Sequence, residues 1–167
     1  MLRRFRHLSI FLFATFLVGC ERDASQDMVG KPFPAFSFPQ PGGTDSVKRE
    51  HLEGSPSLVV FWATWCGYCL DEVEELRELL ARHGADGLKI VGLSIDESPA
   101  AVPLMVSKHS IPYPVGTGAL PLFDSLGLQA LPHSFLLDAH GDVARSFHGA
   151  FPASAFDEAL AELKSKE

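Results

Sequence analysis

Two cysteines that lie two residues apart, Cys66 and Cys69, are the residues of this chain with the clearest capacity for chemistry. Cysteine thiolates exchange disulfides, bind soft metal ions, or pair in a structural disulfide. The chain has 167 residues and three cysteines. A small exported scaffold held by disulfides uses more cysteines at wider spacing, which disfavours a purely structural pair. The elements around the pair and the cellular compartment decide between the remaining uses.

The pair lies where an expected strand meets an expected helix. Residues 57–63, SLVVFWA, form a continuous apolar run typical of a buried central strand. After the cysteines, apolar residues recur at helical spacing until Gly84, and they are Leu70, Val73, Leu76, Leu79 and Leu80. The free N–H groups and the dipole at the start of a helix favour the thiolate of Cys66. We therefore expect a mostly exposed Cys66 that attacks disulfides and a more buried Cys69 that resolves the mixed disulfide.

The later part of the chain predicts an α/β fold with a mixed sheet and helices on both faces. The expected elements are a buried strand at 88–96, a helix at 98–109 that Pro103 ends or kinks in its first turn, a short helix at 119–127, a hairpin at 133–149 around residues 139–142, and an amphipathic helix after Pro152. In the segment 30–43, four prolines exclude a helix. Its phenylalanines, Phe33, Phe36 and Phe38, are expected to close one edge of the core.

The N-terminus has the pattern of an export signal. Three arginines precede an apolar stretch at 8–18, which is too short to cross a bilayer core of about 30 Å as a mature helix. The stretch ends in Leu17-Val18-Gly19-Cys20, which resembles the lipobox of bacterial lipoproteins. That resemblance implies a signal peptide at 1–19, a lipid on Cys20, a polar tether at 20–29, and a protein that faces the periplasm or extracytoplasmic space of the cell envelope. The alternatives are an ordinary signal peptide, in which Cys20 is incidental, and an uncleaved anchor.

The charge of the chain constrains its partners. The formal net charge is −7, and loss of Arg3, Arg4 and Arg6 with the signal would remove three positive charges and leave −10. An acidic protein is not expected to bind nucleic acid or to be attracted to anionic lipids. Membrane contact is then expected through the lipid alone. A lipid on Cys20 also accounts for the odd number of cysteines.

The segment Phe61-Trp62-Ala63-Thr64-Trp65-Cys66-Gly67-Tyr68-Cys69 resembles the active-site segment of thioredoxin-like proteins. More narrowly, the chain resembles the membrane-anchored TlpA/ResA-like group, which includes the CcmG/DsbE cytochrome-maturation reductases. The resemblance covers about residues 29–164. Besides the cysteine segment it includes 30–32, Val91 to Ser94, an insert at about 96–127, and Leu131 to Asp138 followed by Gly141.

This resemblance implies a thioredoxin-like domain at 30–167 in which Pro132 is a cis-proline that faces the cysteine pair. Leu131 would then offer backbone groups that hold the substrate chain beside Cys66. Glu72 falls on the position of an active-site glutamate of the ResA-like proteins, and on composition alone it is equally well a solvated helix residue. We expect the substrate to contact a set of residues near the pair, namely Trp65, Gly67, Tyr68, Leu131, Pro132 and His133.

Several positions depart from the pattern of the group. Val60 stands where thioredoxin has a buried acid, so no proton relay can run through that side chain. Glu74 replaces a helix-kinking proline of many relatives, and His133 follows Pro132 where threonine is usual. The Gly67-Tyr68 dipeptide resembles that of periplasmic disulfide isomerases rather than the Gly-Pro of thioredoxin. The direction of electron flow therefore stays open between reduction and oxidation or isomerisation.

The sequence favours a thiol-disulfide oxidoreductase that reduces oxidised protein thiols, such as those of apocytochrome c, and that a membrane electron donor recharges. We expect no cofactor beyond a redox-active Cys66–Cys69 disulfide. The alternative is a copper or zinc chaperone that uses Cys66, Cys69 and His133. No second Cys-x-x-Cys and no His-x-x-x-His motif accompanies the pair, and so we expect no metal site.

Overall fold

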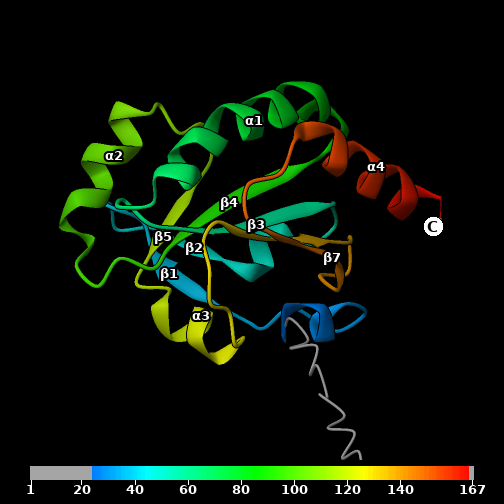
Figure 1. Ribbon diagram of the computed structural model, residues 1–167, viewed down its shortest axis with the longest axis horizontal. Coiled ribbons are helices and arrows are strands. Elements are labelled where there is room, and N and C mark those ends of the chain that lie inside the picture. Colours follow the sequence, from blue (N-terminus) through cyan, green and yellow to red (C-terminus); the bar gives the residue numbers. More distant parts are fainter. Residues whose placement is uncertain (1–23, 166–167) are drawn as a thin grey trace, which may run out of the picture.

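The central sheet has five strands in the order β5-β4-β3-β6-β7 (Figure 1). The computed structural model of the protein describes residues 24–165. The strands are β3 (Ser57–Trp62), β4 (Lys89–Ser94), β5 (Val115–Thr117), β6 (His133–Leu137) and β7 (Val143–His148). β3, β4 and β5 run parallel, whereas β6 pairs antiparallel with β3 and with β7. The predicted strands and the hairpin are confirmed, and β5 was not predicted.

Strand β3 occupies the middle of the sheet, and every one of its residues is buried. Its side chains alternate between the two faces. Phe61 packs against Phe123 and Phe135, at ring-centroid distances of 5.7 and 6.4 Å. An apolar strand buried on both faces is typical of a parallel sheet that helices cover on each side. The end of β3 is therefore held firmly where the cysteine segment begins.

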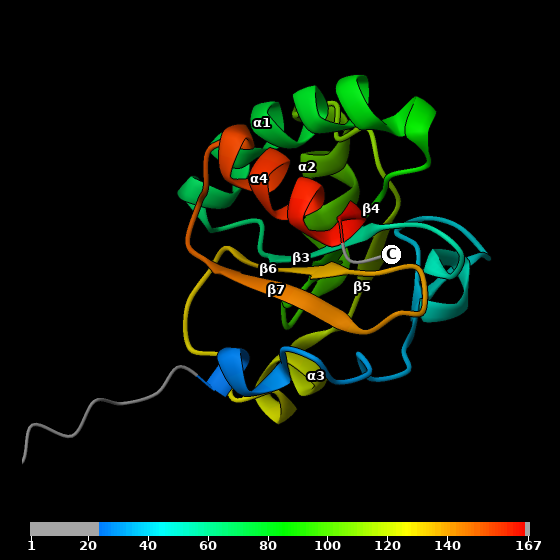
Figure 2. The same ribbon diagram turned by 90° about the vertical axis from the view of Figure 1, so that its right-hand side faces the viewer.

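Helices cover both faces of the sheet, as predicted. They are α1 (Gly67–His83), α2 (Val102–Lys108), α3 (Leu120–Ser125) and α4 (Ala153–Lys164). Figure 2 shows α1, α2 and α4 on one face, and α3 with the N-terminal segment on the other. A short 3-10 turn at Pro99–Ala101 precedes α2, and Pro103 lies in the first turn of α2. The first turn of the predicted helix is thus a 3-10 turn that ends at Ala101, and the change to an α-helix falls just before Pro103.

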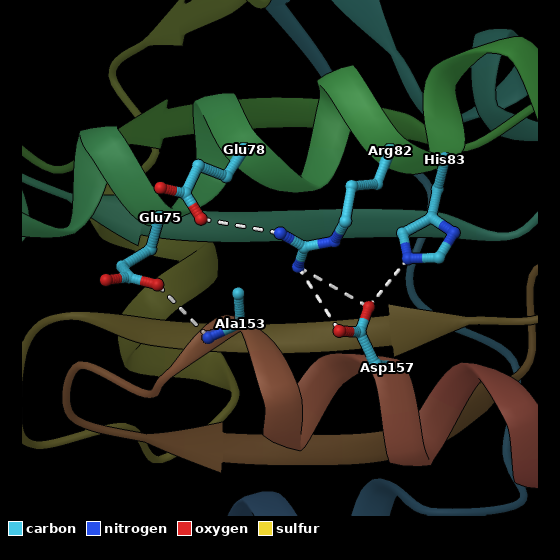
Figure 3. Close-up of polar contacts among 6 residues, drawn as sticks. All are labelled: Glu75, Glu78, Arg82, His83, Ala153 and Asp157. Carbon is cyan, nitrogen blue, oxygen red and sulfur yellow. Dashed lines mark hydrogen bonds and ion pairs between the residues drawn. The ribbon is translucent and has the colours of Figure 1, made fainter.

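Polar contacts join α4 to α1 (Figure 3). Arg82 lies between the carboxylates of Glu78 and Asp157, at 3.4 and 3.2 Å, and His83 Nε2 is 2.6 Å from Asp157. At the start of α4, the backbone N–H of Ala153 donates to the Glu75 carboxylate at 3.2 Å. The Glu75 contact holds the beginning of α4, and with it the end of the loop that follows β7, against the middle of α1, and the Asp157 contacts hold the next turn of α4 against the end of α1.

The N-terminal segment is more ordered than expected. Residues Ala24–Met28 form a 3-10 helix, whereas a polar tether up to residue 29 was predicted. Ser25 is fully buried and accepts a hydrogen bond from the Ser146 hydroxyl on β7 at 2.8 Å. The fold therefore begins before residue 30. The lack of apolar periodicity misled the prediction, because this short helix is held by buried hydroxyl groups.

A small hairpin, which was not predicted, follows this segment. Its strands are β1 (Ser37–Pro39) and β2 (Ser46–Lys48), and a 3-10 turn at Arg49–Leu52 leads towards β3. Phe33 and Phe36 are buried, and Phe38 stacks on Phe36 at 5.7 Å. The predicted closure of the core by these phenylalanines is confirmed. A further 3-10 turn, at Gly84–Asp86, follows α1.

The expected signal peptide and Cys20 lie outside the described residues. Within residues 24–165, no helix is both long and apolar enough to cross a membrane.

Candidate active site

Cys66 and Cys69 form a disulfide at the start of α1, with an S–S distance of 2.01 Å. Cys66 is the N-cap residue, and its Sγ accepts the backbone N–H of Cys69 at 3.2 Å. An N-cap acceptor satisfies one of the N–H groups that a helix leaves free at its start. The predicted placement of the pair at a strand-to-helix junction is confirmed. The end of a rigid strand and the first turn of a helix together fix both sulfur atoms.

Cys66 is more buried than predicted, with only 7% of its surface exposed in this disulfide form. It lies in the wall of a pocket of about 390 Å³ whose other lining residues are Trp65, Gly67, Tyr68, Ile95, Phe123, Gln129, Ala130 and Leu131. Trp65 and Tyr68 are 70% and 75% exposed and rise beside the pair. Neighbouring side chains therefore cover Cys66, but its side of the disulfide faces the pocket. Cys69 does not line this pocket.

The loop before β6 forms the opposite wall of the pocket. Leu131 lines the pocket together with Cys66, and the Leu131–Pro132 peptide bond is cis, as the resemblance implied. Pro132 is buried, and its carbonyl oxygen accepts the backbone N–H of Gly149 at 2.9 Å. Of the two residues, Leu131 is therefore the one that lines the pocket beside Cys66.

Glu72 is buried behind the cysteine pair, with 2% of its surface exposed. Its pKa is raised from 4.5 to about 7: burial is the largest cause, the hydrogen bond from the backbone N–H of Phe151 lowers the pKa, and the Glu75 carboxylate raises it. The Phe151 N–H donates to Oε1 at 3.4 Å, whereas Oε2 has no hydrogen-bond partner among residues 24–165. Glu72 lies three residues after Cys69, on the same side of α1. The solvated alternative for Glu72 is wrong.

His133 does not reach the pocket. Its side chain is 1% exposed, and its Nε2 is 2.9 Å from the Ser146 hydroxyl. The imidazole packs against Phe135 at a centroid distance of 5.0 Å. As the first residue of β6, it is opposite Phe61 in the sheet. The prediction that the His133 side chain contacts substrate is therefore not supported, because the ring is part of the core.

Sequence reasoning missed Asp96, which lies two residues after the end of β4. Its carboxylate accepts hydrogen bonds from the backbone N–H and the hydroxyl of Thr64, at 3.0 and 2.6 Å. The available signal was its position, because ligands and reactive groups gather at the carboxyl ends of parallel strands. β3 and β4 are parallel neighbours, so the residues after them meet at one edge of the sheet.

In the part of the chain that the structure describes, no group of three or more His, Cys, Asp and Glu side chains is arranged to hold a metal ion. The histidine considered as a third ligand, His133, is held by Ser146 instead. At Cys66 and Cys69 the structure has a disulfide at the start of a helix with a pocket beside it, which suits disulfide exchange.

Comparisons with known proteins agree with this geometry. The family model described as Redoxin matches residues 28–163. A Pseudomonas aeruginosa protein named thiol:disulfide interchange protein DsbE is 34% identical, over 81% of this chain and 75% of its own length. A Bacillus anthracis protein named thiol-disulfide oxidoreductase ResA is 29% identical, over 81% of this chain and 78% of its own length.

A solved structure shares the fold. It is a thiol:disulfide interchange protein of the thioredoxin family from Chlorobium tepidum TLS, with a TM-score of 0.69 and 26% identity. The match covers 79% of this chain and 94% of that one. The mixed sheet, the cysteine pair at the start of α1 and these matches lead to one conclusion: the chain belongs to the Redoxin family and has the thioredoxin-like fold of its relatives named DsbE and ResA.

Proposed function

We propose that the protein is a thiol-disulfide oxidoreductase that reduces disulfides in other proteins. The observation that carries this proposal is the position of Cys66, which caps α1 and faces a pocket whose far wall is Leu131. An extended substrate chain in this pocket would lie between Leu131 and the sulfur of Cys66. Relatives named as thiol:disulfide interchange proteins and thiol-disulfide oxidoreductases support the reaction class.

The reaction needs two exchange steps. In the reduced protein, the Cys66 thiolate attacks one sulfur of the substrate disulfide, and the other substrate sulfur leaves as a thiolate that takes up a proton. The Cys69 thiolate then attacks Cys66, which breaks the mixed disulfide and releases the second substrate thiol. The protein ends in the disulfide form seen here. Two electrons and two protons pass to the substrate.

Glu72 is the proposed proton acceptor for Cys69. The second step requires a Cys69 thiolate in a buried place, and burial disfavours any charge there. A carboxyl group on the same side of α1, with a pKa of about 7, can take up the proton near neutral pH. Val60 leaves no acid on the neighbouring part of β3, and Glu72 lies on the same side of α1 as Cys69, so Glu72 is the acid proposed for this step.

The proposed setting is the cell envelope. The lipobox-like segment at Cys20 supports a lipid anchor, which would hold the domain close to a membrane electron donor that restores the dithiol. The resemblance to the CcmG/DsbE reductases supports the reductive direction and apocytochrome c as a client. The exposed Gly67-Tyr68 dipeptide is what favours the alternative, an oxidase or isomerase.

A trapping experiment tests the order of attack. The reduced Cys69→Ser variant should form a stable mixed disulfide with a protein disulfide such as that of insulin, because no second thiol can release the substrate. The Cys66→Ser variant should form none and should lose insulin reduction. Trapping by Cys66→Ser, or reduction at the wild-type rate by that variant, would remove Cys66 as the nucleophile.

A further inference from the structure

The carboxylate of Asp96 binds the segment that leads into Cys66. The backbone N–H of Thr64 lies 3.3 Å from Oδ1 and 3.0 Å from Oδ2, and the Thr64 hydroxyl donates to Oδ1 at 2.6 Å. On the other side, the Ser94 hydroxyl donates to Oδ2 at 2.7 Å and accepts the backbone N–H of Asp96 at 3.2 Å. Both oxygens of Asp96 are therefore engaged, and its orientation is fixed.

Thr64 lies within the tight turn between β3 and α1. The Cys66 N–H donates to the Ala63 carbonyl at 3.1 Å, and so Thr64 and Trp65 are the central residues of this turn. Trp62 and Ser94 are partners at the ends of β3 and β4, which brings Asp96 beside the turn. A carboxylate fixed by β4 thus holds the residue from which Trp65 and Cys66 follow.

The negative charge of Asp96 has no cation beside it. Asp96 is 7% exposed, and among residues 24–165 it forms no ion pair. Burial of an unpaired charge is unfavourable, even where hydrogen bonds stabilise it. An asparagine would keep one acceptor oxygen for Thr64, but its NH2 group could not accept the hydrogen bonds that Oδ2 takes from the Thr64 N–H and the Ser94 hydroxyl. The site therefore uses a carboxylate with two acceptor oxygens, and the buried negative charge comes with it.

Other titratable groups surround the cysteine pair. Glu72 is buried on α1 three residues after Cys69, and Tyr68 lines the same pocket as Cys66. The pocket that contains Cys66 has no charged residue in its lining, whereas a second pocket, which shares Trp65 with the first, is lined by Asp96 and Glu97. Of these carboxylates, Asp96 is the one that touches the turn before Cys66.

We propose that Asp96 is a positioning residue for disulfide exchange, which holds Trp65 and Cys66 in place through Thr64 and makes the Cys66 thiolate harder to form. The inference rests on the proposed function and deepens it. A fixed negative charge near Cys66 disfavours a second negative charge there. A less stable thiolate makes the reduced protein a stronger electron donor. This effect would oppose that of the N-terminus of α1, which stabilises the Cys66 thiolate.

The test uses the full-length protein in detergent, in the reduced state. Alkylation by iodoacetamide at a series of pH values gives the pH at which half of Cys66 is thiolate. In Asp96→Asn this midpoint should fall by roughly half a pH unit. Asp124→Asn is the matched control, because Asp124 is an exposed carboxylate on α3 and its loss changes the net charge equally. Its midpoint should equal that of the wild type.

Thr64→Val separates the hydrogen bonds from the charge. This variant keeps the carboxylate and the backbone N–H but loses the hydroxyl that donates to Asp96. Its midpoint should not fall, whereas kcat/KM for insulin reduction should drop several-fold, because Trp65 and Cys66 are less well fixed. Thr64→Ser, which restores a hydroxyl, should recover most of the wild-type kcat/KM.

The results of these experiments distinguish a failure of the inference about Asp96 from a failure of the proposed function. If Asp96→Asn lowers only the melting temperature and leaves the midpoint and the kinetics unchanged, Asp96 is merely structural and the inference is wrong. If Asp96→Asn does not fold, an unchanged kcat/KM in Thr64→Val contradicts the inference by itself. Failure of the proposed reductase function would appear instead as an inactive wild type, and the alkylation midpoints would still report on Asp96.

Discussion

The backbone N–H of Phe151 donates a hydrogen bond to Oε1 of Glu72, which joins the loop after β7 to the buried side of α1 at 3.4 Å. This contact places the carboxyl group behind Cys69, where burial raises its pKa to about 7. An unfolded chain would lose this proton near pH 4.5. Between these two values the folded protein holds a proton that the unfolded protein has released, and so stability falls as the pH rises.

Glu72→Gln should therefore stabilise the oxidised protein at pH 8 and have little effect at pH 4. The neutral amide keeps an acceptor for Phe151 and removes a buried charge. The pKa difference corresponds to roughly 3 kcal/mol in the free energy of unfolding at pH 8. Denaturant unfolding of both proteins at the two pH values measures this effect.

Glu74→Gln is the control for this comparison, because the Glu74 side chain is 70% exposed and lies on the same helix. Its stability should differ from that of the wild type by less than about 0.5 kcal/mol at either pH. A Glu72→Gln variant whose stability changes with pH as steeply as that of the wild type would show that Glu72 does not titrate in this range.

Trp65→Ala should weaken substrate binding with little change in stability. The side chain is 70% exposed, so its removal should change the free energy of unfolding by less than about 0.5 kcal/mol. It lines the pocket beside Cys66, and an exposed aromatic side chain is a typical contact for a protein partner. KM for insulin should rise several-fold, with a smaller effect on a small disulfide such as oxidised glutathione.

Leu104→Ala provides the matched control for Trp65→Ala, since Leu104 is 68% exposed on α2 and lies outside the pocket. Its kinetic constants should equal those of the wild type. A Trp65→Ala variant with an unchanged KM for insulin would remove Trp65 from the substrate contacts.

Cys20→Ala should release the protein from the membrane. The lipobox-like segment predicts that Cys20 carries the lipid, and the described part of the chain has no helix suited to span a bilayer. Fractionation of cells that express the variant should place the protein in the soluble envelope fraction, with insulin reduction intact. Retention of Cys20→Ala in the membrane fraction to the same extent as the wild type would contradict the lipid anchor.

Local sequence patterns are sufficient to predict the strand and the helix that hold the cysteine pair. The apolar run at 57–63 and the helical spacing after Cys69 correspond to β3 and α1, because both elements are specified by residues close in sequence. The cis bond at Pro132 followed from the resemblance rather than from the residues themselves. Composition alone does not decide whether Glu72 is a buried site residue or a solvated one, although its spacing from Cys69 and Leu76 places it on the buried side of α1.

The features that the sequence does not predict depend on contacts between distant parts of the chain. Asp96 binds Thr64, which is 32 residues away, and the parallel pairing of β3 with β4 brings the two together. His133 is buried because β6 places it opposite Phe61 and near Ser146. The 3-10 helix at Ala24–Met28 depends on Ser25, whose partner lies on β7. None of these contacts leaves a periodic signal in a single sequence.

The reduction potential of the Cys66–Cys69 pair tests the central claim most directly. The full-length protein would be equilibrated with thiol buffers of defined potential, and its free thiols would be quantified by alkylation. A reductase of protein disulfides should have a potential near that of thioredoxin, about −270 mV. A potential above that of protein disulfide isomerase, about −180 mV, would contradict the reductive direction and assign the protein as an oxidant.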